Sequence, residues 1–236
     1  MSAANGSCLP CLQAVQNAVD EARTIHGDEI DAIEAVGGPE AHTYGELTPL
    51  GVRALATRLK LGPDDFFVDL GSGAGRAVLQ IAKEFHVATS CGVEMAATRH
   101  EMAMEALESA EPQLADRVRF IQGDCADSAL WSSADAPLAK VTVIFAANIF
   151  FGPQLSRRLA RLIEAAPNLR AVATLKRWPA ATDEAEAAGL VGFDEQLPPE
   201  PCETSWKAPD ELGQVGASAE DSCSPLYVFC RKGGER

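Results

Sequence analysis

The 236-residue chain has no apolar run near the roughly 20 residues that a transmembrane helix needs, which argues against a membrane-spanning segment. Residues 1–10 have neither a basic stretch nor a long apolar core, so we expect no signal peptide and no secretion. Without a sign of secretion, the seven cysteines are expected to be free thiols. Apolar residues make up 47%, which excludes disorder of the whole chain.

Basic residues are also scarce: 20 lysines and arginines face 34 acidic residues, a net charge of −14. A chain of this charge repels the phosphate backbone of nucleic acid, so we expect no strong direct binding to nucleic acid. We expect an affinity for basic partners instead. Only Cys8 and Cys11 have the spacing of two cysteine ligands of a metal ion, and no second closely spaced Cys pair or His pair would complete a zinc site. We therefore predict no metal.

Apolar stretches that end in glycine or polar residues alternate with helical patterns along most of the chain. Strands are predicted at 66–70, 88–93, 118–121, 141–146 and 170–175, with helices at 77–85, 95–110 and 154–165. Earlier helices are predicted at 12–22, 30–36 and 48–61, and late strands at 197–205 and 226–231. The pattern predicts an α/β fold: a mostly parallel sheet with helices on both faces, an N-terminal helical extension and a C-terminal antiparallel hairpin.

The strongest single signal is the glycine loop at residues 68–76, Val-Asp-Leu-Gly-Ser-Gly-Ala-Gly-Arg, between a strand and a helix. Gly71 and Gly73 would let a ligand approach the backbone. Glu94, at the end of the next strand, suits ribose hydroxyls. Asp69 would oppose the pyrophosphate of a dinucleotide but suits a cationic group, such as the amino-acid end of S-adenosylmethionine. A dinucleotide enzyme and a turn without a ligand stay open as alternatives.

Gly123 and Asp124 follow the third predicted strand, where a carboxylate can accept a hydrogen bond from an adenine amino group. Together with Asp69 and Glu94, Asp124 would complete a crevice at the carboxyl ends of three neighbouring strands. The sequence therefore predicts a nucleoside-like cofactor at this edge of the sheet.

Several short segments occur together in a characteristic order. They are Tyr44-Gly45-Glu46, the glycine loop followed by Val78-Leu79-Gln80, Gly92-Val93-Glu94, Gly123-Asp124, Asn148-Ile149-Phe150-Phe151-Gly152-Pro153, Ser205-Trp206 and a closing strand at 226–229. From about residue 44 to residue 231 the chain resembles the Dot-one family (disruptor of telomeric silencing) of histone-lysine methyltransferases, which have a class I fold rather than a SET domain. The segments most specific to this family are Tyr44-Gly45-Glu46 and the one from Asn148 to Pro153.

The resemblance implies a role for each matching residue. Those implied to hold S-adenosyl-L-methionine are Tyr44, Gly45 and Glu46 as a cover, Asp69, Gly71 and Gly73 at the methionine end, Glu94 at the ribose, and Asp124 and Cys125 at the adenine. Asn148 would lie near the transferred methyl group, and Phe151 and Trp206 would line the lysine channel. The family commonly has phenylalanine at the position of Cys125, and a second asparagine at that of Ala147.

The implied function is transfer of a methyl group to a lysine on the folded core of a histone, in the nucleus or cytoplasm. Residues 1–47 would form the extension and the covering loop, and residues 48–236 the methyltransferase domain. The lysine-rich, DNA-contacting segment of well-studied nuclear members has no counterpart here. A methyltransferase for a non-histone protein or small molecule, and an inactive domain that binds S-adenosylmethionine, are the alternatives.

Overall fold

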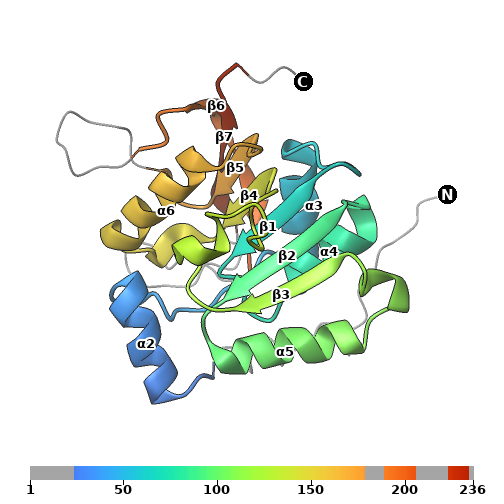
Figure 1. Ribbon diagram of the computed structural model, residues 1–236, viewed down its shortest axis with the longest axis vertical. Coiled ribbons are helices and arrows are strands. Elements are labelled where there is room, and N and C mark those ends of the chain that lie inside the picture. Colours follow the sequence, from blue (N-terminus) through green and yellow to red (C-terminus); the bar gives the residue numbers. More distant parts are fainter. Residues whose placement is uncertain (1–23, 179–188, 206–222, 234–236) are drawn as a thin grey trace.

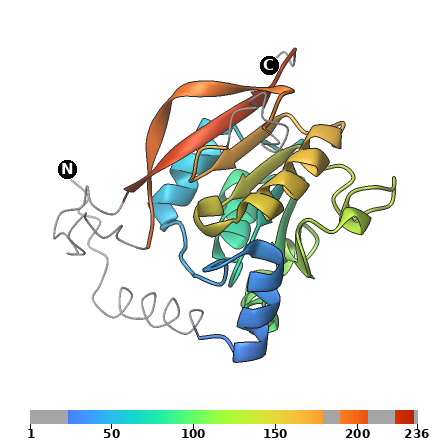
Figure 2. The ribbon, with the colours of Figure 1, turned by 90° about the vertical axis from the view of Figure 1, so that its left-hand side faces the viewer.

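The computed structural model describes residues 24–178, 189–205 and 223–233, and within these ranges it contains one seven-stranded sheet. The strand order is β3-β2-β1-β4-β5-β7-β6. Five strands run parallel, whereas β7 is antiparallel to both of its neighbours. The strands are β1 (Phe66–Leu70), β2 (Thr89–Glu94), β3 (Val118–Gln122), β4 (Val143–Ala146), β5 (Ala171–Thr174), β6 (Phe193–Glu203) and β7 (Cys223–Arg231). Figure 2 shows β6 and β7 side by side as a long hairpin.

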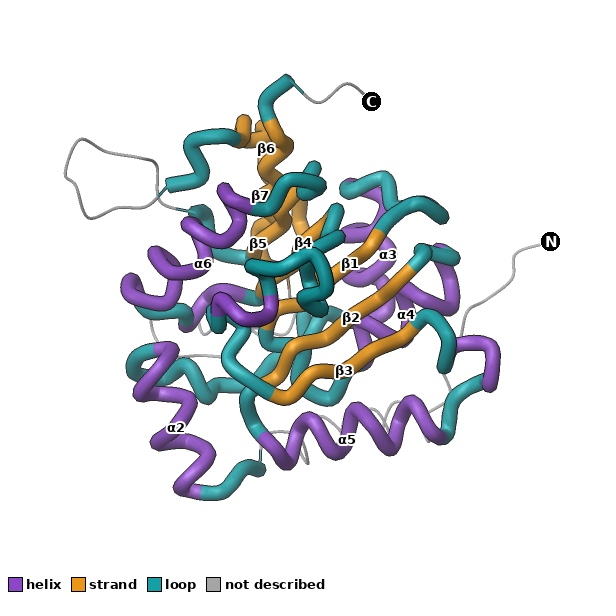
Figure 3. Tube along the Cα trace, viewed as in Figure 1, coloured by secondary structure: helices purple, strands orange, loops and turns teal. Residues whose placement is uncertain are grey.

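Helices flank this sheet on both sides (Figures 1 and 3). They are α2 (Gly27–Gly37), α3 (Pro49–Arg58), α4 (Arg76–Phe85), α5 (Ala97–Glu108) and α6 (Pro153–Ala165), with 3-10 turns at Pro112–Leu114, Ser128–Leu130 and Asn148–Phe150. Side chains alternate along each central strand. Val68 and Ile144 face the α6 layer, whereas Phe67 and Val143 pack with the α3 and α4 layer. The predicted parallel sheet with its C-terminal antiparallel hairpin is confirmed.

Local sequence signals explain where the elements begin. The side chain of Thr48 accepts a hydrogen bond from the Gly51 amide, and Pro49 occupies the first turn of α3, as expected for a capped helix start.

The predicted helix at 12–22 lies outside the described residues. None of the described helices combines the length and the apolar character needed to cross a membrane.

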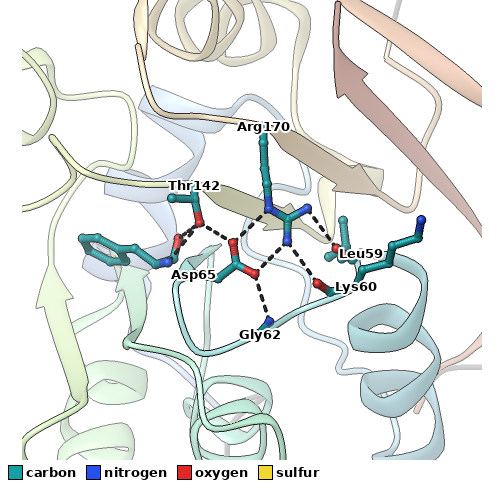
Figure 4. Close-up of polar contacts among 7 residues, drawn as sticks. Leu59, Lys60, Gly62, Asp65, Thr142 and Arg170 are labelled. Atoms are coloured by element: carbon teal, nitrogen blue, oxygen red, sulfur yellow. Dashed lines mark hydrogen bonds and ion pairs between the residues drawn. The ribbon is translucent and has the colours of Figure 1, made fainter. Parts of the chain in front are cut away.

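The amino ends of β1, β4 and β5 are joined by a buried ionic network around Asp65 (Figure 4). The Arg170 guanidinium donates to both carboxylate oxygens of Asp65, at 2.9 and 2.7 Å, and Thr142 Oγ1 donates at 2.8 Å. Burial alone would raise the pKa of Asp65, but the hydrogen bonds from Arg170, Thr142 and Gly62 together lower it. This network joins the three strands at their amino ends, on the side of the sheet opposite to their carboxyl ends.

Replacing Arg170 with methionine should destabilise the fold by about 3 kcal/mol at neutral pH, because it leaves the Asp65 carboxylate buried without its ion partner. The lowered pKa means that Asp65 contributes stability above its unfolded pKa, and that this contribution is lost as the pH falls through the folded value. Denaturant unfolding across a pH series measures both effects. The surface pair Arg53–Glu84 provides the control, and equal effects of Arg53→Met and Arg170→Met would contradict the prediction.

Candidate functional site

A pocket of about 260 Å³ lies at the carboxyl ends of the parallel strands. Its walls come from the ends of β1, β2 and β3, from the segment after β4, and from α2. Figure 1 places α2 on the side toward which the arrowheads of β2 and β3 point. Ile33 and Val36 of α2, Leu155 of α6, and Phe150 and Phe151 give the pocket an apolar wall. Ligands of open α/β sheets bind at this edge.

Both ends of α2 are fixed to the rest of the site. At its start, Glu29 accepts hydrogen bonds from the Thr98 amide and hydroxyl, at 2.8 and 2.7 Å, at the first turn of α5. At its end, the Gly152 amide donates to the Gly37 carbonyl at 2.7 Å. A Cβ on Gly152 would lie 2.6 Å from that carbonyl oxygen, so the close approach requires glycine. The helix is thus joined to α5 at its start and to the residue before α6 at its end.

The glycine loop holds the Glu94 carboxylate in place. Glu94 Oε2 accepts from the Gly73 amide at 2.8 Å, and Oε1 accepts from the Ala96 amide at 2.9 Å. Glu94 and Gly71 line the pocket, whereas Gly73 does not. The carboxylate is therefore already oriented at the strand end where a ribose was predicted.

Asp69 is buried at the end of β1, and its Oδ1 atom has no hydrogen-bond partner in the structure. Burial, together with the carboxylates of Glu94 and Glu46, raises the pKa of Asp69 to about 8. Asp69 does not itself line the pocket, but Leu70 and Gly71, which follow it, do. A buried carboxylate oxygen without a hydrogen-bond partner suits a ligand group that is cationic or donates a hydrogen bond.

The cover segment, residues 42–48, lies over the glycine loop. The Tyr44 hydroxyl donates to Glu46 and accepts from the Ala74 amide, and Arg76 forms a 2.7 Å ion pair with Glu46. Burial raises the pKa of Glu46, and the contacts from Tyr44 and Arg76 oppose the rise. Tyr44 and Gly45 line the pocket, whereas the Glu46 carboxylate is engaged by protein partners outside it.

The cover segment is also joined to the end of β6. Leu47 forms an antiparallel bridge with Thr204, the Ser205 amide donates to the Glu46 carbonyl at 2.7 Å, and the Glu46 amide donates to Ser205 Oγ at 2.9 Å. A second contact follows at Thr48, whose amide donates to the Glu203 carbonyl. The hairpin strand therefore supports the cover from outside.

Asp124 and Cys125 line the pocket beyond β3. Asp124 Oδ1 accepts from the Ala126 amide at 2.8 Å, and Oδ2 pairs with Arg158 of α6 at 2.7 Å. Burial, with the charges of Asp124 and Glu94, raises the pKa of the Cys125 thiol to about 12. At neutral pH the thiol is thus an uncharged, partly buried surface of the pocket.

The segment after β4 contains two of the predicted catalytic residues. Phe151 lines the pocket near Gly71. Asn148 is buried and does not line the pocket: its Nδ2 donates to the Lys176 carbonyl at 3.0 Å and its Oδ1 accepts from the Lys176 amide at 2.8 Å. The asparagine thereby ties the end of β4 to the end of β5, and its role near the methyl group stays a prediction. Trp206 lies outside the described residues.

The structure thus brings most of the predicted residues to one place. Those that line the pocket are Tyr44, Gly45, Gly71, Glu94, Asp124, Cys125 and Phe151; Glu46, Asp69, Gly73 and Asn148 lie around it. Sequence reasoning missed the wall from α2 and the buried Arg99. The spacing of Ile30, Ile33 and Val36 indicated the helix but not what it covers, and a lone arginine gave no signal. Among the described residues, no three His, Cys, Asp or Glu side chains gather as metal ligands.

Comparisons with known proteins agree with this geometry. Residues 37–186 match the family model of the histone methylation protein DOT1. A histone-lysine N-methyltransferase, H3 lysine-79 specific, of Drosophila melanogaster is 30% identical over 66% of this chain and 8% of its own length. The protein of the same name from Mycosarcoma maydis is 25% identical over 72% of this chain and 22% of its own.

The crystal structure of the methyltransferase domain of bacterial CtHen1-CN aligns with a TM-score of 0.52 and 12% identity, over 78% of this chain and 99% of that one. At this identity the likeness shows the fold, and it confirms the predicted class I arrangement. The chain spans less than a quarter of the length of the two relatives above. The family match covers more than half of the chain and includes the cover segment, the glycine loop and the segment after β4, and so the chain belongs to the DOT1 family of histone methylation proteins.

Proposed function

We propose that the protein is an S-adenosylmethionine-dependent protein-lysine methyltransferase that acts on a lysine of a histone core. The observation that carries the proposal is the pocket itself. Gly71, Glu94 and Asp124, at three neighbouring strand ends, line it in a chain that belongs to the DOT1 family. The relatives named above are histone-lysine methyltransferases, which supports the choice of substrate.

The residues around the pocket fit the cofactor. S-adenosylmethionine carries an ammonium group, and the buried, unpartnered Oδ1 of Asp69 supplies an acceptor for it beside the glycine loop. The fixed carboxylate of Glu94 suits the ribose hydroxyls. Asp124 and Cys125 would flank the adenine, with Asp124 oriented by Arg158. These assignments explain why several acidic groups are retained around one mostly apolar pocket.

When bound, the cofactor supplies a methyl group on a positively charged sulfur, ready for in-line displacement by an amine. The protein's part is to position the two groups and exclude water. A lysine amine must lose its proton before it can attack, although its usual pKa is about 10.4. The apolar wall that includes Phe150 and Phe151 disfavours the charged amine, and aromatic faces attract both the ammonium and the sulfonium methyl group.

The test of this proposal is methyl transfer from labelled cofactor to free histones, nucleosomes and a whole lysate. Transfer to a histone is the expected result, and Glu94→Ala should reduce it on every substrate because this variant removes the ribose acceptor. A labelled non-histone band without histone labelling would support the first alternative. Cofactor binding without transfer to any substrate would indicate the inactive binding domain.

Transfer to free histones should fall as salt is raised from low to moderate concentration, because attraction between a chain of charge −14 and a basic protein is screened over about 8–10 Å near physiological ionic strength. The same salt series on nucleosomes compares substrates that differ in exposed basic surface. Activity that is independent of salt on free histones, or confined to nucleosomes, would contradict the charge argument.

A further inference from the structure

Arg99, in the first turn of α5, is a buried cation at the pocket with no role in the proposed chemistry. Only 4% of its surface is exposed. Among the described residues that line the pocket, it is the only lysine, arginine or histidine. Burial lowers the pKa of Arg99, and the nearby Glu94 carboxylate opposes this. Burying a guanidinium is unfavourable unless its contacts compensate, so its contacts indicate its function.

Two of those contacts are with the cover segment. Arg99 Nη2 donates to the His42 carbonyl at 2.7 Å, and the guanidinium carbon lies 4.7 Å from the centroid of the Tyr44 ring. The first contact fixes the backbone two residues before Tyr44, and the second fixes the ring. A single side chain on α5 therefore contacts the start of the cover segment at two points, the His42 backbone and the Tyr44 ring.

Tyr44 in turn contacts the glycine loop. A Cβ on Gly73 would lie 2.4 Å from Tyr44 Cε2, so the ring rests directly on the loop. The hydroxyl accepts from the Ala74 amide and donates to Glu46, which pairs with Arg76 at the start of α4. Tyr44 is thus held between the Arg99 guanidinium and the loop that is expected to contact the cofactor.

We propose that Arg99 is a positioning residue that presses the cover segment onto the glycine loop, so that the pocket is closed on this side before the cofactor arrives. A segment ordered in advance loses little conformational freedom on binding, which strengthens affinity. The role is in binding rather than in the transfer step. It rests on the proposed function, since it assumes that S-adenosylmethionine occupies the pocket.

The test compares Arg99→Met and Arg99→Lys with the surface control Arg53→Met, using calorimetric binding of S-adenosylhomocysteine and single-turnover methyl transfer. Arg99→Met should raise the dissociation constant and the KM for cofactor by about 10-fold to 100-fold, the size of a lost hydrogen bond to a charged group plus a cation–π contact, with kcat at saturating cofactor nearly unchanged. Arg99→Lys keeps the charge and should restore part of the affinity. Thermal unfolding checks that each variant is folded.

A double variant and a second ligand separate positioning from direct contact. Because Arg99 is argued to act through Tyr44, the effects of Arg99→Met and Tyr44→Leu should be clearly less than additive. Adenosine, which lacks the amino-acid end, should also bind to Arg99→Met more weakly than to the unaltered protein. Additive effects, a loss confined to ligands with a carboxylate, or unchanged affinity in Arg99→Met would overturn the inference. Failure of the unaltered protein to bind S-adenosylhomocysteine would instead overturn the proposed function.

Discussion

Asp69→Asn should weaken cofactor binding by about 100-fold and at the same time stabilise the ligand-free fold. Asparagine keeps the shape of the side chain but cannot carry the negative charge that an ammonium group requires. The stabilisation follows from the burial of Asp69 beside Glu94 and Glu46, which raises its pKa to about 8. Loss of function with a gain in stability is the pattern of a group retained for binding.

The pH dependence has a definite sign. Between the unfolded pKa of about 4 and the folded pKa of about 8, Asp69 is protonated when folded and ionised when unfolded, so stability falls as the pH rises through this range and levels off above it. Asp69→Asn should remove this decline. Binding of an ammonium group near pH 7 should release the Asp69 proton, which calorimetry in two buffers of different ionisation enthalpy measures.

The matched control is Asp64→Asn, which makes the same change of charge on an exposed residue five positions earlier in the chain. It should alter neither binding nor the pH dependence of unfolding. Full cofactor affinity in Asp69→Asn, or a decline in stability that persists in this variant, would show that Asp69 neither binds the cofactor nor titrates near pH 8.

Gly73→Ala should abolish detectable cofactor binding, although it adds only one methyl group. The new Cβ would lie 2.4 Å from the Tyr44 ring, and the backbone φ of +54° is strained for any residue with a Cβ. Tyr44 cannot simply swing away, because Arg99 and the Ala74 amide hold it. The cover must therefore lift from the loop. Calorimetry with S-adenosylhomocysteine and protection of the cover segment from proteolysis measure the two effects.

Gly62→Ala places the same methyl group where no heavy atom lies within 4 Å, and it should leave binding unchanged. A Gly73→Ala protein with normal affinity would mean that the loop and the cover tolerate separation, and would contradict the contact. The sequence predicted that Gly73 faces the ligand, whereas in the structure the Tyr44 ring packs against Gly73.

The sequence predicted the order of strands and helices well because glycine, proline and capping residues mark most of the boundaries. Thr48-Pro49 and the glycine loop are examples in which a local signal and the structure coincide. The predicted site residues converge for a topological reason: parallel strands end at the same edge, so Gly71, Glu94 and Asp124 come together although 53 positions separate the first from the last.

What sequence reasoning missed depends on contacts between distant segments. Nothing in the residues around Arg99 indicates that its guanidinium meets Tyr44, 55 positions earlier in the chain. Likewise, Asn148 was assigned to the reaction because of its motif, whereas in the structure its amide joins β4 to β5 through Lys176. The division of the chain at residue 47 stays a prediction.

The bridge between Leu47 and Thr204 has a consequence for where this domain can be cut. Every described residue that lines the pocket lies between Ile33 and Leu155, and the family match ends at residue 186. A fragment that stops there would contain every described residue that lines the pocket but neither β6 nor β7. It would lack the strand that supports residues 46–48 from outside. We therefore expect the shortest fragment that keeps the cover segment in place to extend beyond the residues that line the pocket.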